Sequence, residues 1–158
     1  MKLQFAAALA ACVLAAPLSA HEYTLGDLVI DHPVALETPK TAKSGAGYLS
    51  VTNTGEAPDR LLEVRADFPM VMLHTTEESD GVARMVHLEG IDIPAGETVT
   101  LAPSGMHVMF MGLDNPFEVG EQVPATLVFE EAGEVDVVFE VEARDGADGG
   151  MGDHSGHD

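Results

Sequence analysis

The segment Pro69–Leu113, PMVMLHTTEESDGVARMVHLEGIDIPAGETVTLAPSGMHVMFMGL, contains three runs in which thioether and imidazole side chains alternate with other residues. Side chains two positions apart in an extended chain lie on the same face. Each run, interpreted as a β-strand, therefore has a face that carries sulfur and imidazole nitrogen. These faces comprise Met70, Met72 and His74; Met85 and His87; and His107, Met109 and Met111.

The same alternation continues on both sides of this segment and predicts further short strands. Residues rich in β-branched and aliphatic side chains are separated by turn sequences such as Asn53-Thr54-Gly55, Asp80-Gly81 and Ala132-Gly133. Outside the first 20 residues no segment has a helical apolar period. Short strands with frequent turns predict a single all-β domain, an antiparallel β-barrel or sandwich. The expected strands are 24–30, 45–53, 60–66, 70–77, 81–89, 97–103, 106–113, 123–131 and 133–141.

The combination of thioether and imidazole side chains favours a soft metal ion. Methionine sulfur is a soft ligand and imidazole a borderline one, a mixture that suits monovalent copper better than magnesium, calcium or manganese. Methionine is also a common filler of cores, and a single histidine on an apolar face is usually only hydrogen-bonded there. Three separate segments repeat the pattern, however, and this favours one copper site formed by His74, Met85, His107 and Met109.

Charge and cysteine content exclude several classes of protein. The chain has 27 acidic and seven basic residues, a net charge of −20, and such a surface repels nucleic acid and anionic lipid. Cys12 is the only cysteine. A blue-copper electron carrier needs a cysteine ligand, so a mature chain without Cys12 is not one.

The first 20 residues have the features of a secretory signal peptide. A short basic start at Lys2 precedes an apolar run that ends in Leu18-Ser19-Ala20, and the run is too short to span a bilayer. Cleavage after Ala20 is expected to release a periplasmic chain that begins at His21 and does not insert into the membrane. In the alternative interpretation, a lipid is attached at Cys12 and tethers the protein.

The last 17 residues, 142–158, change in character. Glycine and acidic residues dominate and almost nothing apolar is left to bury, so the sequence predicts a disordered tail after a domain at 21–141. Met151, His154 and His157 lie within seven residues of one another in this tail. Two imidazoles and a thioether form a candidate site that would hold a metal ion loosely, although a solvated terminus needs no function.

The four candidate ligands also resemble the pattern of a known family. The spacing of His74, Met85, His107 and Met109 is similar to that of the PCu(A)C family of periplasmic copper chaperones. The resemblance extends over roughly residues 22–142, in the blocks YLSVTNTGEAPDRLLEVRA, LHTTEESDGVARM, IDIPAGETVTLAPSGMHVMFMGL and EVGEQVPATLVFEEAGEVDVVFEV. One departure is that Val34 and Leu36 follow the early His-Pro where the family often has tryptophan and arginine.

The resemblance implies a cupredoxin-like β-barrel that binds Cu(I) through these four residues and is not an enzyme. It further implies delivery of copper to the copper-site subunit of cytochrome oxidase or to another periplasmic copper protein, with the tail binding Cu(II). A periplasmic copper buffer for tolerance is the alternative function. An oxidative enzyme with a copper centre at an N-terminal His21 is disfavoured, because the chain has no tryptophan and only two tyrosines for a substrate face.

Overall fold

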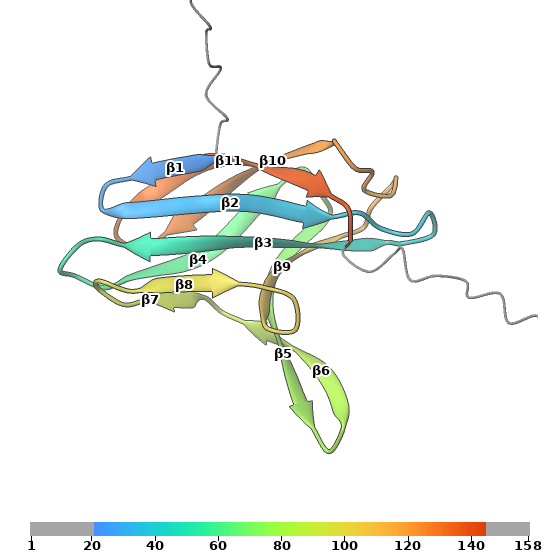
Figure 1. The fold of residues 1–158 in the computed structure, drawn as a ribbon, viewed down its shortest axis with the longest axis horizontal. Coiled ribbons are helices and arrows are strands. Elements are labelled where there is room, and N and C mark those ends of the chain that lie inside the picture. The colour runs from blue at the N-terminus through green and yellow to red at the C-terminus, as the bar shows by residue number, and fades with distance from the viewer. Residues whose placement is uncertain (1–20, 145–158) are drawn as a thin grey trace, which may run out of the picture.

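The computed structural model describes residues 21–144, and within that range every regular element is a β-strand (Figure 1). This confirms the predicted all-β single domain. The strands are β1 (Glu22–Leu25), β2 (Leu28–Leu36), β3 (Ser44–Asn53), β4 (Asp59–Ala66), β5 (Met70–Ser79), β6 (Val82–Leu88), β7 (Ile91–Ile93), β8 (Thr98–Leu101), β9 (Met106–Met111), β10 (Gln122–Phe129) and β11 (Gly133–Glu142).

The strands form one strongly curved sheet in the order β6-β5-β9-β3-β2-β11-β10-β4-β7, with β1 added to β2 and β8 added to β3. All pairings are antiparallel except that of β11 with β2, which is parallel. The sheet is therefore mixed, whereas the sequence predicted antiparallel pairing throughout. A parallel pair needs a long connection, and here almost the whole domain lies between its two strands.

The largest difference from the prediction is at the first expected strand, 24–30. It is divided by a tight turn at Gly26, where φ is 58°, so that β1 folds back on β2. β2 then continues past His32, which has a φ of 49° at an irregularity in the β2–β3 pairing. The short strand β7 was not expected, because three residues are too few to show an alternation.

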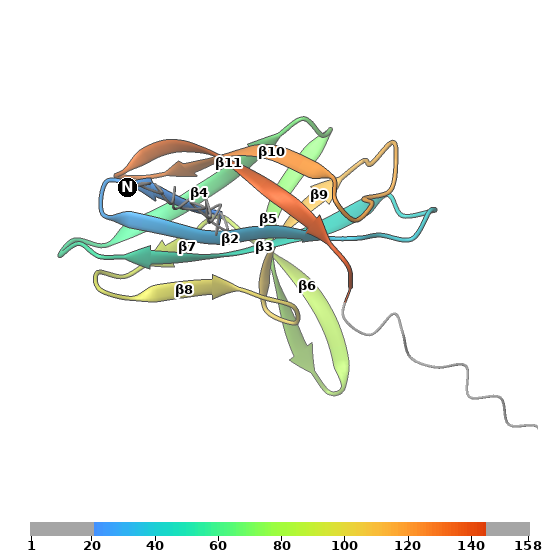
Figure 2. The same ribbon diagram turned by 45° about the horizontal axis from the view of Figure 1, so that its top comes forward.

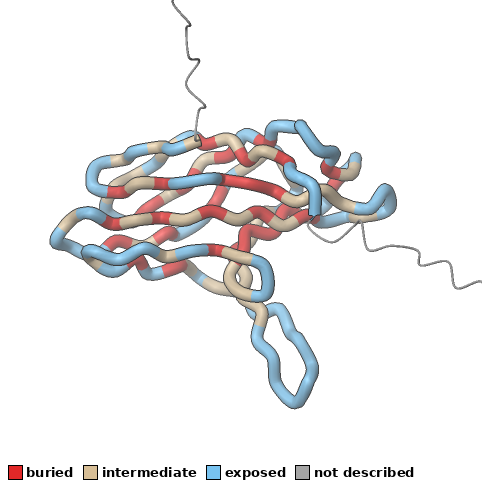
Figure 3. The backbone as a smooth tube through the Cα atoms, viewed as in Figure 1, coloured by how far each residue is buried: buried red, intermediate tan, exposed pale blue. Residues whose placement is uncertain are grey.

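The core consists of buried aliphatic and aromatic side chains. Figure 3 shows the buried positions alternating with less buried ones along the strands of the body. Phe110 of β9 packs edge-on against Phe139 of β11, with ring centroids 5.5 Å apart. Gly47 of β3 lies directly beneath both rings, because an added Cβ atom would come within 2.9 Å of Phe110 and 3.0 Å of Phe139. Close packing around Phe110 fixes the position of β9, the strand that carries His107 and Met109.

The hairpin formed by β5 and β6 extends away from the body of the domain (Figures 1 and 2). Its turn is formed by Asp80 and Gly81, with φ values of 54° and 73°. Positive φ at both central residues is the geometry of a type I′ turn, which suits a two-residue hairpin loop. Every residue from Glu77 to His87 is exposed, whereas the base of β5 is partly buried against the body (Figure 3).

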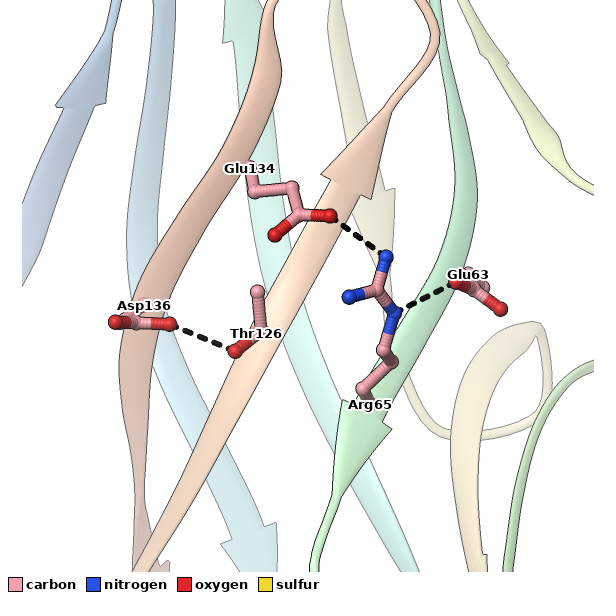
Figure 4. Close-up of polar contacts among 5 residues, drawn as sticks. All are labelled: Glu63, Arg65, Thr126, Glu134 and Asp136. Atoms are coloured by element: carbon pink, nitrogen blue, oxygen red, sulfur yellow. Dashed lines mark hydrogen bonds and ion pairs between the residues drawn. The ribbon is translucent and has the colours of Figure 1, made fainter.

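Far from this hairpin, the outer face of β4, β10 and β11 carries paired polar side chains (Figure 4). Arg65 donates hydrogen bonds to Glu63 and to Glu134, each at 2.7 Å, and these bonds raise the pKa of its guanidinium further. Thr126 donates a hydrogen bond to Asp136 at 2.7 Å. These pairs lie at the exposed surface, where they contribute little to stability.

None of the described residues belongs to a helix that would be long and apolar enough to cross a membrane.

Candidate copper site

The candidate ligands lie on three adjacent strands, with β5 between β6 and β9. His74 of β5 pairs directly with His107 of β9 on one side and with His87 of β6 on the other. Met72 pairs with Met109. Because directly paired residues lie on the same face of a sheet, the predicted faces of the three strands form one continuous surface of thioether and imidazole groups.

His107 is held in an orientation that leaves one ring nitrogen free. The side chain is only 4% exposed. Its Nδ1 lies 3.1 Å from the carbonyl oxygen of Gly105, which also accepts a hydrogen bond from the backbone N–H of Thr76. A carbonyl only accepts, so Nδ1 carries the proton and Nε2 presents a lone pair. Nε2 is buried without a hydrogen-bond partner, and a second nitrogen fixed by a backbone carbonyl is typical of histidine metal ligands.

His74 lies half-buried beside His107, and its surroundings favour the neutral form of its ring. Its Nδ1 is buried and has no hydrogen-bond partner. Burial lowers the pKa of His74 below the ordinary value of 6.5, and the neighbouring His107 and His87 rings lower that pKa further. Neutral imidazole is the form that binds metals. Two buried nitrogen atoms without partners are costly in a folded protein, and a bound metal ion would satisfy both.

The distance between the two rings suits a shared metal ion. The centroids of His74 and His107 are 5.8 Å apart, and the ring planes are inclined at 73°. An imidazole nitrogen lies about 2 Å from its metal in protein sites, so the ring centre lies roughly 3 Å from it. Two rings on one ion can therefore have centres up to roughly 6 Å apart. The 5.8 Å separation of the two centroids lies within this limit.

The two methionines of the predicted site have opposite environments. Met109 lies two residues beyond His107 on the same face of β9 and is 8% exposed. Met85 pairs with Thr76, which follows His74 by two residues toward the hairpin tip and lies on the same face. Met85 is 62% exposed. The structure thus brings His74, His107 and Met109 together at the base of the hairpin. It places Met85 at the outer edge of the same face.

Thioether groups lie beside the histidines on this surface. Across residues 21–144, no three histidine, cysteine, aspartate or glutamate side chains are grouped closely enough to hold a metal ion. Thioethers are soft ligands and favour monovalent copper over harder ions. The candidate tail site of Met151, His154 and His157 lies outside the described residues.

His87 was not among the predicted ligands. The structure places it directly opposite His74. The two ring centroids are 5.9 Å apart. The sequence alone could have indicated this pairing, because the Asp80-Gly81 dipeptide is typical of a two-residue type I′ turn. Counting outward from that turn on both strands pairs His74 with His87.

Comparisons with known proteins show the family of this chain. Residues 28–141 match the model of a family described as "Putative lipoprotein LpqE-like". "Putative lipoprotein Lxx21020" of Leifsonia xyli subsp. xyli is 33% identical over 143 residues, which cover 88% of this chain and 85% of the relative.

Solved structures of PCuAC domains are also similar. The copper-bound PCuAC domain from PmoF2 is 34% identical with a TM-score of 0.67, over 78% of this chain and 99% of that one. The apo PCuAC domain from PmoF1 is 30% identical with a TM-score of 0.68, over 78% and 100%. The Cu(I) form of DR1885 from Deinococcus radiodurans is 30% identical with a TM-score of 0.59, over 79% and 83%.

These matches cover nearly all of the described domain, and the predictions of the fold and of a non-enzymatic copper-binding protein are confirmed. The chain belongs to the LpqE-like family of PCuAC copper-binding domains.

Proposed function

We propose that this chain is a periplasmic carrier that binds Cu(I) through His74, Met85, His107 and Met109 and delivers it to another copper protein. The observation that carries the proposal is the pair of buried, unpartnered nitrogens, His74 Nδ1 and His107 Nε2, on a face that also presents Met109. The Cu(I) form of the similar protein DR1885 supports the same oxidation state here.

The chemistry of the four residues suits a reversible carrier. Two thioethers and two neutral imidazoles bind Cu(I) without loss of a proton above the ordinary histidine pKa of about 6.5. The bound ion keeps its single positive charge. Met85 lies at the exposed edge of the site, so the ligands of an acceptor can replace those of the carrier one at a time.

A competition titration tests Cu(I) binding. The protein is titrated anaerobically with Cu(I) in the presence of a coloured Cu(I) chelator, and one equivalent should be withdrawn from the chelator by residues 21–144. Failure to compete would contradict the proposal.

The acceptor we propose is the copper-site subunit of cytochrome oxidase. The site lies at the base of a protruding hairpin and is exposed at Met85, and this supports transfer between proteins. Mixing the Cu(I)-loaded protein with the apo copper domain of the oxidase should produce the absorption of the assembled copper centre after oxidation. A periplasmic buffer would instead retain its copper in this assay, and deletion of its gene would reduce copper tolerance while oxidase activity stayed normal.

We further propose that the tail residues Met151, His154 and His157 add a Cu(II) site. Copper stoichiometry, measured in each oxidation state on the full chain and on a chain truncated after Val141, tests this. The truncated chain should lose one Cu(II) and keep its Cu(I).

For export we propose cleavage after Ala20, with lipid attachment at Cys12 as the competing route. The names of the matched family and of the Leifsonia xyli relative describe lipoproteins and support the second route. The intact mass of the exported protein distinguishes the two.

A further inference from the structure

His87 is an imidazole on the copper-site face that the four-ligand site does not use. It pairs directly with His74, with ring centroids 5.9 Å apart and planes inclined at 86°. The separation of His74 from His107 is almost the same, 5.8 Å. By the argument applied above to the inner pair, roughly 6 Å between ring centres allows one ion to bind both rings. His74 therefore has a potential partner on each side.

The two strands beside β5 repeat the same pair of donors. β9 presents His107 and Met109 two residues apart on one face, and β6 presents Met85 and His87 two residues apart on that face. His74 lies between the pairs. Each flank thus offers one borderline nitrogen and one soft sulfur, the combination that suits Cu(I).

The donors differ mainly in their exposure. His107 and Met109 are 4% and 8% exposed, His74 is half-buried, and His87 and Met85 are exposed. The order of strands is also the order of exposure, from β9 through β5 to β6 (Figure 3). A path for copper from the buried pair to solvent, or to an acceptor, therefore crosses His74 and reaches His87.

We propose that His87, with His74 and Met85, forms an outer copper position through which Cu(I) enters and leaves the buried site. At the inner position copper is bound by His107 and Met109 together with His74 and Met85. During transfer the bonds to His107 Nε2 and Met109 sulfur break as a bond to a His87 nitrogen forms, while His74 and Met85 stay bound. No electron or proton moves, and the ion keeps its single charge. This proposal rests on the proposed Cu(I)-carrier function.

Transfer kinetics test the proposal. Removal of Cu(I) from the loaded protein by excess bicinchoninate is followed by stopped flow, alongside loading of the apo protein. In His87→Gln both rates should fall by about tenfold or more, the order of effect that follows loss of a group supporting a metal site. The equilibrium affinity should stay at the wild-type value, because an intermediate position affects both directions equally. Unchanged rates would overturn the proposal. A large loss of affinity would also overturn it and would make His87 a ligand of the resting site.

Arg84→Gln provides the matched control. Arg84 is an exposed residue of β6 that pairs with Glu77 on the opposite face of the hairpin. Its replacement should leave both rates unchanged. Equal slowing in this variant would assign the effect to a damaged hairpin and would contradict a specific role for His87.

A second measurement isolates the outer position. In the double variant His107→Gln, Met109→Leu the buried site loses both of its β9 ligands, and weaker Cu(I) binding should remain at His74, His87 and Met85. Adding His87→Gln should abolish this residual binding, and adding Arg84→Gln should not. Residual binding that survives His87→Gln would overturn the outer position. If wild-type protein binds no Cu(I) at all, the proposed function itself fails, and that result is distinct from either outcome for His87.

Discussion

Two regions of the molecule bury polar side chains, and the hydrogen bonding of these side chains differs between the regions. Asn53 and Asp59 lie in the body of the domain, and His107 lies at the base of the hairpin; these are the buried polar residues among those described. Asn53 donates hydrogen bonds to the carbonyl oxygens of Ala57 and Ile93, at 2.8 and 3.2 Å, and accepts one from the backbone of Gly55.

Asp59 is equally well satisfied. Its carboxylate accepts hydrogen bonds from the backbone N–H groups of Arg60, Glu131 and Ala132, at 2.7 to 3.0 Å. His107 instead donates a hydrogen bond from Nδ1 to the carbonyl oxygen of Gly105 and leaves Nε2 without a partner. Each polar side-chain atom of Asn53 and Asp59 thus has a hydrogen-bond partner, whereas His107 keeps one atom free for a metal ion. The satisfaction of each buried atom therefore separates structural residues from functional ones.

The largest expected effect is on copper affinity. Met109→Leu preserves an apolar side chain of similar volume but removes the sulfur, so the Cu(I) affinity should fall by about 100-fold or more, beyond the effect of losing a supporting group. Apo stability should change by less than about 1.5 kcal/mol. Chelator competition and urea denaturation measure the two quantities. Met106→Leu, on the other face of β9, is the control, and a near-wild-type affinity in Met109→Leu would remove Met109 from the site.

The converse change breaks the structural side of the comparison. Asn53→Ala leaves the buried carbonyl group of Ile93, the carbonyl group of Ala57 and the N–H of Gly55 without their side-chain partner, and the free energy of unfolding should fall by about 2–3 kcal/mol. Cu(I) affinity of the folded protein should not change, because Asn53 belongs to the body and contacts none of the site. Urea denaturation of the apo protein and chelator competition check both expectations. A specific loss of copper affinity would show that the two regions are coupled.

A substitution beneath the core aromatic rings links the two regions. In Gly47→Ala the new Cβ atom would contact Phe110 and Phe139 too closely, and such overpacking should cost about 1–3 kcal/mol of stability. Gly47 pairs with Val108, the neighbour of His107, so displacement of β9 should also weaken Cu(I) binding slightly. Thermal unfolding and chelator competition measure the effects. Wild-type stability in this variant would mean that the two rings shift without cost.

The smallest expected effect concerns protonation. The pKa of His74 in the apo protein is below 6.5 because of burial and its two histidine neighbours. An unfolded chain with the ordinary pKa binds more protons, so stability of the apo protein should fall as pH decreases through 6.5. An NMR titration of the His74 ring gives the pKa. In His87→Gln the pKa should rise toward 6.5, since one of the neighbours that lowers it is removed. An unchanged pKa would limit the cause to burial and His107.

Much of this arrangement could be predicted from the sequence, because both the fold and the site depend on a period of two. Alternation placed Met72 and His74 on one face and His107 and Met109 on another, and the pairing of β5 with β9 brought those faces together. Alternation in single strands does not reveal which distant strands pair. The parallel contact of β11 with β2 and the burial of His107 therefore emerged only with the structure. Whether all four predicted ligands bind one ion stays a prediction.

The two-residue turn at Asp80 and Gly81 has a consequence for the changes in length that the site can accept. With this loop, Met85 pairs with Thr76 and shares the face of His74. A residue added to the loop itself leaves this pairing, and hence the face of Met85, unchanged, because paired residues share a face of the sheet. A residue inserted into β6 between the turn and Met85 would instead reverse the side on which Met85 emerges, because side chains alternate along a strand. Parity within the strand, and not the length of the loop, therefore keeps this sulfur on the metal-binding face.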